Sequence, residues 1–363
     1  MKALLKKLIE AKSTTDVGEL NCARILADYF KSAGLKPKID IWDKTRANIT
    51  VHLKSTGEKP GLLFVGHLDV VPAEGDSMFK PAERDGKIFG RGACDMKGGL
   101  VASAAAIVEI AKSNIKLKGD IIYSATAGEE TDSSGIKKFI KSFKNKNLCG
   151  IIVPEPTDFG LVAAHRGLLW LRIITKGKSA HSSMPHLGIN AIDSMRIFLN
   201  ELAKFKIPGT NKLLGKASLS VNKINGGAAS NIVPELCSTE IDIRTVPGQD
   251  IKSIVEGINE IIDRLAKINP NFQAQLQILR QAGSLQTDTK SKFVKQLTNI
   301  LKTQPKPVPF TTDAPFLSAL NIPIVIFGPG LPGLCHKPNE HIKIKDLKNG
   351  VEHYKRIFKH LLV

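Results

Sequence analysis

Histidine and acidic residues stand at positions in this chain where a buried strand would end. His67 and Asp69 come directly after the apolar run 62–65, and Asp95 precedes a glycine pair and a helical run. The i, i+2 spacing of His67 and Asp69 places both side chains on the same side of an extended chain. An imidazole held by a neighbouring carboxylate is suited to bind a metal through its other ring nitrogen. Taken alone, the same pattern also fits an ordinary surface pair.

Three further apolar runs end in the same kinds of residue. Glu129 and Glu130 follow one run, Glu155 follows the next, and His336 follows the loop after the third. In open, mostly parallel α/β sheets, functional sites form at the carboxyl edge of the strands. Acidic residues that merely faced solvent would flank strands at both ends, so we expect these side chains to meet at one edge. The three runs are residues 120–127, 150–153 and 322–327.

The residue types at this edge favour hard or borderline divalent metals. Two histidines and three carboxylates match zinc, cobalt or manganese rather than copper or an iron–sulfur cluster. Five ligands are more than one tetrahedral catalytic site needs, and they would serve two metals if one carboxylate bridges them. Glu129 is then placed to act as a general base beside the ligand Glu130. A solvated acidic turn is the alternative interpretation of these two glutamates considered alone.

The elements that carry these residues predict two domains. Residues 1–167 and 282–363 alternate apolar strands with helices, which indicates an α/β catalytic domain: a mostly parallel mixed sheet with helices on both faces. The middle of the chain reads instead as four strands and two helices, so residues 168–281 are expected to form an inserted α+β sandwich. The expected strands are 168–176, 217–224, 237–244 and 272–279, and the expected helices are 191–204 and 251–266.

Composition narrows the class of protein. The 363 residues carry a formal net charge of +18, but the lysines are scattered and no aromatic residues interleave with them, which argues against a nucleic-acid partner. No apolar run is long enough to cross a membrane. Five cysteines without a Cys-x-x-Cys pair indicate reduced thiols rather than a disulfide framework. We therefore expect a cytoplasmic protein that acts on a small molecule.

A series of motifs spread over nearly the whole chain resembles the M20 metallopeptidase family. Within that family the chain is similar to the acetylornithine deacetylase and succinyl-diaminopimelate desuccinylase group. The motifs, in order, are GHLDVVP, GRGACDMKGG, AGEETDSSG, VPEPT, KGKSAHSSMPHLGINAI, NGGAASNIVPE, DIRTVPG, TTDAPF and FGPG…CHKPNE.

The resemblance implies two metal ions, zinc above all, with cobalt or manganese as alternatives. One ion would be held by His67, Asp95 and Glu155, and the other by Asp95, Glu130 and His336, so that Asp95 bridges them. Glu129 would be the general base and acid, and Asp69 would orient His67.

The resemblance also implies a role for the inserted domain as lid and dimerisation domain. His181 would reach the active site of the other subunit of a homodimer and stabilise the oxyanion. Asn231 and Arg244 would bind the carboxylate end of the substrate. Lid closure would exclude water and bring these residues in.

The resulting expectation is a di-zinc hydrolase of linear amides that removes the acyl group of an N-acyl amino acid. N-acetylornithine or a related N-acetyl amino acid is the first expected substrate, because the stretch 165–167 and TTDAPF resemble the deacetylase side. Succinyl-diaminopimelate is the alternative, although residues 310–313 read Phe-Thr-Thr-Asp where desuccinylases tend to carry Gly-Thr-Ser-Asp. An M20 dipeptidase or aminoacylase comes next. A metal-free binding protein on the same fold is the alternative from a different class.

Overall fold

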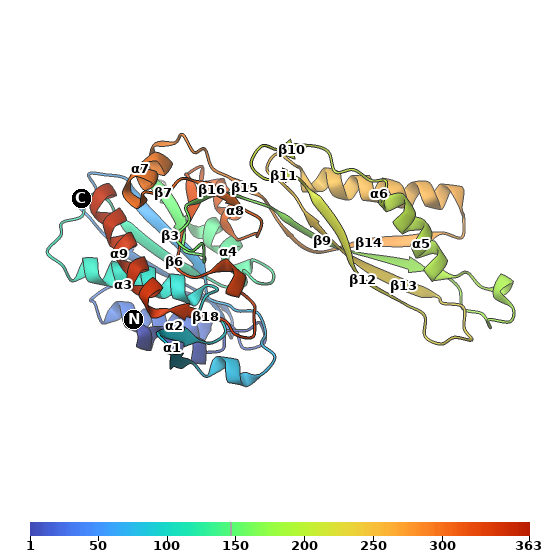
Figure 1. Ribbon diagram of the computed structural model, residues 1–363, viewed down its shortest axis with the longest axis horizontal. Helices are drawn as coiled ribbons and strands as arrows, with labels where there is room; N and C mark the ends of the chain where they lie inside the picture. The colour runs from blue at the N-terminus through green and yellow to red at the C-terminus, as the bar shows by residue number, and fades with distance from the viewer. Residues whose placement is uncertain (146) are drawn as a thin grey trace. The chain divides into compact units, whose positions relative to one another are not determined.

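The computed structural model of the protein describes residues 1–145 and 147–363. The chain divides into two compact units (Figure 1). Unit 1 comprises Met1–Ala164, Gln286–Pro307 and Thr312–Val363, and unit 2 comprises His165–Leu285 and Val308–Thr311. The expected insertion, 168–281, falls within unit 2. The functions assigned to the two domains stay predictions.

A mixed sheet forms the centre of unit 1. Its strands run in the spatial order β1-β2-β6-β3-β7-β17-β8-β15, and β16 pairs with β8. Their bounds are β1 Lys38–Asp43, β2 Arg46–Leu53, β3 Gly61–His67, β6 Ile121–Thr126, β7 Leu148–Val153, β8 Val162–His165, β15 Leu285–Gln286, β16 Lys306–Val308 and β17 Ile324–Ile326. A smaller antiparallel sheet is made of β4 Ala82–Arg84, β5 Lys87–Phe89 and β18 His341–Lys343.

The strands that were expected to deliver the site residues lie side by side and point the same way. β3 is parallel to both β6 and β7, and β17 is parallel to β7. The antiparallel pairs, among them β1 with β2 and β17 with β8, lie farther out in the sheet. Because parallel strands end at the same edge, the residues after β3, β6 and β7 meet there.

Both faces of this sheet are covered by helices. Every residue of β3 is buried, and Leu62 and Phe64 belong to the main hydrophobic cluster, whereas Leu63 and Val65 point to the opposite face. A strand that is apolar on both faces is typical of a parallel sheet between two helical layers. The helices of unit 1 are α1 Lys2–Glu10, α2 Leu20–Lys31, α3 Lys97–Ala111, α4 Ser134–Ser142, α7 Lys292–Leu301, α8 Ala314–Leu317 and α9 Ile344–Leu361.

The helices of unit 1 form two groups, as Figure 1 shows. α3 packs on α1 and α9, and α7 also contacts α9, so these helices form a continuous layer with α2. α4 and α8 pack on each other and contact β6 and β17 respectively. The predicted fold class, a mixed α/β sheet with helices on both faces, is confirmed.

Unit 2 is an α+β layer structure. Its sheet has the order β12-β13-β9-β14, and all of these pairs are antiparallel. Alternate residues of β13, from Cys237 to Ile243, are buried against α5 and α6, which together with the sheet form a second hydrophobic cluster. The bounds are β9 Leu168–Lys176, β12 Ser218–Gly226, β13 Leu236–Arg244, β14 Gln273–Ala282, α5 Ala191–Leu202 and α6 Ile251–Ile268, with a short hairpin of β10 Thr210–Asn211 and β11 Gly215–Lys216.

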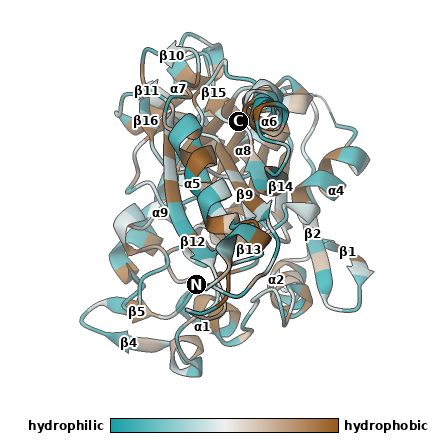
Figure 2. Cartoon of the chain, turned by 90° about the vertical axis from the view of Figure 1, so that its right-hand side faces the viewer, coloured by the Kyte–Doolittle hydropathy of each residue, from teal (hydrophilic) through white to brown (hydrophobic). Residues whose placement is uncertain are grey.

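The helices of unit 2 are amphipathic, as the hydropathy colours in Figure 2 show. Ile254, Ile258, Ile261 and Leu265 form the buried side of α6 at helical spacing. Asn190 and Asp250 accept backbone N–H groups at the starts of α5 and α6, which stabilises both helix ends. None of the described helices is long and apolar enough to cross a membrane.

Candidate metal centre

The carboxyl edge of the unit 1 sheet collects the predicted ligands. His67 is the last residue of β3, Glu129 and Glu130 lie in the turn after β6, and Glu155 lies two residues after β7. Asp95 comes from the segment before α3. Gly99 allows α3 to approach this edge, because a Cβ there would collide with the Pro154 carbonyl oxygen.

His67 is held in the tautomer that a metal ligand needs. Its Nδ1 lies 3.0 Å from the backbone carbonyl oxygen of Asp69. Because a carbonyl only accepts, Nδ1 carries the hydrogen, and Nε2 of the neutral ring presents its lone pair. That Nε2 lies 3.3 Å from Asp95 Oδ1 and 3.6 Å from Glu155 Oε1. Asp69 therefore orients the ring mainly through its backbone, since its carboxylate oxygen Oδ1 is farther away, at 3.5 Å.

The carboxylate of Asp95 stands between the two histidines. Its Oδ1 faces His67, and its Oδ2 lies 3.3 Å from Nε2 of His336. The same nitrogen of His336 lies 2.9 Å from Glu130 Oε1. The ligand atoms of His67, Asp95 and Glu130 lie within 4.8 Å of one another. These contacts bring the five predicted ligands together, and the two oxygens of Asp95 face the two histidines. The division of the ligands into two metal sets stays a prediction, because the group within 4.8 Å takes His67 from one set and Glu130 from the other.

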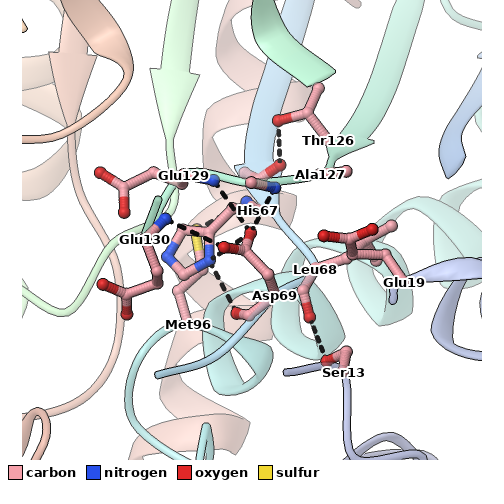
Figure 3. A network of polar contacts seen from close by, with 12 residues as sticks. Ser13, Glu19, His67, Leu68, Asp69, Met96, Thr126, Ala127, Glu129 and Glu130 are labelled. Atoms are coloured by element: carbon pink, nitrogen blue, oxygen red, sulfur yellow. Dashed lines mark hydrogen bonds and ion pairs between the residues drawn. The ribbon is translucent and has the colours of Figure 1, made fainter. Parts of the chain in front are cut away.

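The side chain of Asp69 organises the turn that bears the glutamates. Its Oδ1 accepts the backbone N–H groups of Gly128 and Glu129 at 2.9 and 3.0 Å, and its Oδ2 accepts that of Glu130 at 2.9 Å (Figure 3). Burial raises the pKa of this carboxyl, but the imidazole of His67 and the backbone N–H groups of Glu130 and Glu129 lower it by more, so that the pKa falls below its usual value. Asp69 thus links the end of β3 to the position of Glu129 and Glu130.

Carboxyl groups outnumber the imidazoles at this centre. Burial raises the pKa of Glu129 and of Glu155 well above the usual range, and repulsion from neighbouring carboxylates adds to both shifts. Hydrogen bonds that His336 donates to the carboxylates of Asp95 and Glu130 raise the pKa of its imidazole to about 10. A buried surplus of carboxylates is stabilised by cations. The donor set, imidazole nitrogen and carboxylate oxygen, fits zinc, cobalt or manganese, so the residues present fit two divalent metal ions.

A small cavity adjoins the predicted general base. It has a volume of about 10 Å³, and its lining includes His67, Glu129, Glu155 and Asp313. This is roughly the space that one water molecule occupies. Asp313 also accepts a hydrogen bond from the Ser133 hydroxyl, 2.7 Å away, in the segment between the glutamates and α4.

The three remaining predicted site residues belong to unit 2. Nδ1 of His181 accepts the backbone N–H of Ser183 at 3.2 Å, so the hydrogen of the neutral ring is on Nε2, which is left as a donor. Asn231 lies on the neighbouring segment, and its carbonyl accepts the N–H of Ser182. Arg244 forms a bidentate ion pair with Asp242, in which Nε and Nη2 donate to Oδ1 and Oδ2 at 2.8 and 2.9 Å. Their roles in binding and catalysis stay predictions.

Sequence reasoning assigned no role to four buried polar residues around this centre. Arg91 and Glu340 form an ion pair behind Asp95, and Glu19 lies near Asp69. The fourth is Asp313. Arg91, Glu340 and Asp313 lie inside the motifs GRGACDMKGG, CHKPNE and TTDAPF, respectively. Their place in these motifs was the only sequence feature that could have indicated a role. Glu19 stood in no motif, and its burial next to the centre is visible only in the structure.

Comparisons with known proteins show which family and which solved structures the chain resembles. The model of peptidase family M20/M25/M40 matches residues 63–360. Acetylornithine deacetylase of Buchnera aphidicola is 33% identical over 336 residues, covering 89% of this chain and 86% of that protein. A probable succinyl-diaminopimelate desuccinylase of Staphylococcus epidermidis is 30% identical, covering 98% of this chain and 96% of that protein. The structure of an M20 family metallo-carboxypeptidase from Sulfolobus solfataricus has the same fold, with a TM-score of 0.83 at 21% identity, and the match covers 99% of this chain and 98% of that chain.

Proposed function

Because this chain belongs to peptidase family M20/M25/M40, we propose that it is a two-metal hydrolase that removes the acyl group of an N-acyl amino acid. The observation that carries the proposal is the Asp95 carboxylate between His67 and His336, with one oxygen toward each. A carboxylate so placed could hold two metal ions, one through each of its oxygens. The metals that fit this donor set best are two zinc ions, with cobalt or manganese as alternatives.

The proposed reaction is hydrolysis of a linear amide by water. Bound divalent ions would polarise the scissile carbonyl and make a water molecule more acidic. Glu129 takes the proton of that water and later delivers it to the leaving amine. His181, reaching in from the second copy of the homodimer, donates its Nε2–H to the developing oxyanion, and such electrostatic stabilisation is usually the largest single contribution to the rate. Asn231 and Arg244 bind the carboxylate of the substrate.

N-acetylornithine or a related N-acetyl amino acid is the first candidate substrate. The similarity to an acetylornithine deacetylase at 33% identity supports it. N-succinyl-diaminopimelate is the second candidate, and it is supported by the match to a probable succinyl-diaminopimelate desuccinylase over 98% of this chain. The two substrates share an amide next to an amino-acid carboxylate and differ in the acyl group.

We place this enzyme in the cytoplasm as a homodimer formed through unit 2. The five cysteines are free in the structure, which supports a reducing compartment. β12 is an edge strand of the unit 2 sheet and exposes Val221 and Ile224, so it offers a surface for a second copy. Light scattering of the purified protein at several concentrations tests the dimer.

A substrate panel tests the activity. Release of primary amine from N-acetylornithine, N-succinyl-diaminopimelate and a dipeptide is measured with added zinc or cobalt and again with a chelator. We expect metal-dependent release from one acyl class. Release that persists in excess chelator, or silence across the panel with metal bound, would overturn the proposal. A chain that binds no metal at all would favour a binding protein on this fold.

A further inference from the structure

A buried ion pair lies behind the metal-binding residues of unit 1. Arg91 and Glu340 are 249 residues apart in the chain, yet Nη1 of Arg91 lies 2.6 Å from Oε2 of Glu340. Both residues are almost completely inaccessible, with 4% and 1% of their surface exposed. A buried ion pair is weak evidence for stability, because desolvation offsets its attraction. The further hydrogen bonds of Arg91 and Glu340 therefore indicate the role of the ion pair.

Glu340 holds the backbone that carries the central carboxylate. Its second oxygen, Oε1, accepts the N–H of Cys94 at 3.0 Å and that of Asp95 at 3.1 Å. Hydrogen bonds to a charged acceptor are stronger than neutral ones. Glu340 thereby sets the position of Asp95, whose two oxygens face the two histidines.

Arg91 holds the segment that carries the second histidine. Its Nη2 donates to the carbonyl oxygens of His336 and Pro72, at 3.4 and 3.3 Å. His336 has a φ of +64°, in the left-handed region that a non-glycine residue adopts only when its surroundings hold it there. The hydrogen bond from Arg91 is one such restraint on His336. The same guanidinium also donates to the carbonyl oxygen of Pro72, in the segment after β3.

The two sets of ligands differ in how they depend on this pair. His67 ends β3 and is oriented by Asp69, and Glu155 follows β7, so both are placed by the central sheet. His336 lies ten residues beyond β17 in an irregular segment and is half-exposed. Of the two histidines, only His336 accepts a hydrogen bond from Arg91 through its backbone carbonyl, within the part of the chain that the structure describes.

We propose that the Arg91–Glu340 pair is a positioning device that holds Asp95 and His336 in register, so that the second metal site exists only while the pair is intact. This inference rests on the proposed function for the identity of the metal ligands. Neither Arg91 nor Glu340 touches the substrate, and both act through the backbone of the ligands. Loss of the pair weakens the site of Asp95, Glu130 and His336 more than the site of His67, Asp95 and Glu155. Two ligands of the former site, Asp95 and His336, are held by the pair, whereas the latter site shares only Asp95.

The decisive variant replaces both charges. A single replacement would leave an unpaired buried charge and destabilise the fold, whereas replacing both partners with apolar side chains of similar size is often neutral. The test variant is therefore Arg91→Met/Glu340→Met. The matched control is Lys355→Met/Glu109→Met, which removes the pair between α9 and α3, 2.7 Å long, away from the centre.

Cobalt(II) is titrated into metal-free wild type and both double variants, followed by calorimetry and by visible absorption of the bound ion. We expect two equivalents for wild type and for the control. For Arg91→Met/Glu340→Met we expect a smaller loss of affinity for one equivalent, which shares only Asp95 with the pair, and a loss at least about tenfold greater for the other. Arg91→Lys keeps a charge for Glu340 but shortens the reach to His336, and it should weaken the same single equivalent.

Two results would overturn the proposal. One is binding of both equivalents by the Arg91→Met/Glu340→Met variant as tightly as by wild type. The other is equal weakening of both equivalents, since the pair would then serve the whole unit. If this double variant does not fold, Arg91→Lys decides by the same criterion. Wild type that binds no cobalt would refute the proposed function instead, so the two failures are distinguishable.

Discussion

Glu19 gives unit 1 a pH dependence that can be measured. It immediately precedes α2, is 1% exposed, and accepts a hydrogen bond from Arg46 at 2.8 Å. Burial raises the pKa of Glu19 from 4.5 to about 7, repulsion from Asp69 adds to the shift, and Arg46 opposes it. Figure 3 shows Glu19 and Asp69 in the same network. The buried carboxyl therefore resists ionisation.

The direction in which the free energy of unfolding changes with pH follows from the protons bound by the folded and the unfolded chain. Below pH 4.5 the carboxyl is protonated in both the folded and the unfolded chain, so its contribution is constant. Between pH 4.5 and about 7 the unfolded chain releases the proton and the folded chain keeps it, so the free energy of unfolding falls as pH rises. Each pH unit in this window corresponds to about 1.4 kcal/mol, so the total loss is about 3 kcal/mol.

Glu19→Gln is expected to remove this loss. Glutamine resembles the protonated carboxyl, so the variant should match wild type near pH 4.5 and exceed it by about 3 kcal/mol at pH 8. The protein has two tryptophans, and Trp42 lies in unit 1. A Trp170→Phe background therefore lets Trp42 fluorescence report urea unfolding of unit 1 alone, in metal-free protein.

An exposed glutamate serves as control. Lys2 and Lys6 lower the pKa of Glu83 to about 2, so Glu83→Gln should show no gain at pH 8. The reasoning is refuted if wild type and Glu19→Gln differ in free energy of unfolding by the same amount at pH 4.5 and pH 8. Such a result would mean that Glu19 is already ionised in the folded chain at low pH.

Three further outcomes are expected. Glu129→Gln should keep its bound metal and lose turnover by about 10²–10⁴-fold, because the ligands remain while the proton relay is gone; turnover near the wild-type rate would contradict its role. His181→Ala should lower turnover and leave metal content unchanged, and equal loss of both would assign His181 to the fold or the metal centre. Phe64→Ala removes a fully buried ring that packs edge-on against Tyr354 and Phe358. It should lower the free energy of unfolding by about 3–5 kcal/mol in the same fluorescence assay, and a loss below about 1 kcal/mol would contradict the packing.

Local patterns in the sequence were sufficient for most of the elements. The expected strand 168–176 coincides with β9, and the expected helix 251–266 differs from α6 only by two residues at its end. Both carry a strong periodicity of apolar residues, and such periodicity depends only on neighbours along the chain. α9 was not predicted, although Leu347, Val351, Tyr354 and Phe358 repeat at helical spacing and are all buried.

The sequence by itself determined which residues end the strands, and therefore which side chains reach the carboxyl edge of the sheet. The place of Asp95 between His67 and His336 was implied by the resemblance, and the structure gives its distances. Only the tertiary structure decided that Arg91 meets Glu340 and that Glu19 is buried. The physical reason is the distance along the chain over which each kind of interaction acts. Periodicity and turn residues act over a few positions, whereas contacts between residues hundreds of positions apart are set by the order and packing of the strands.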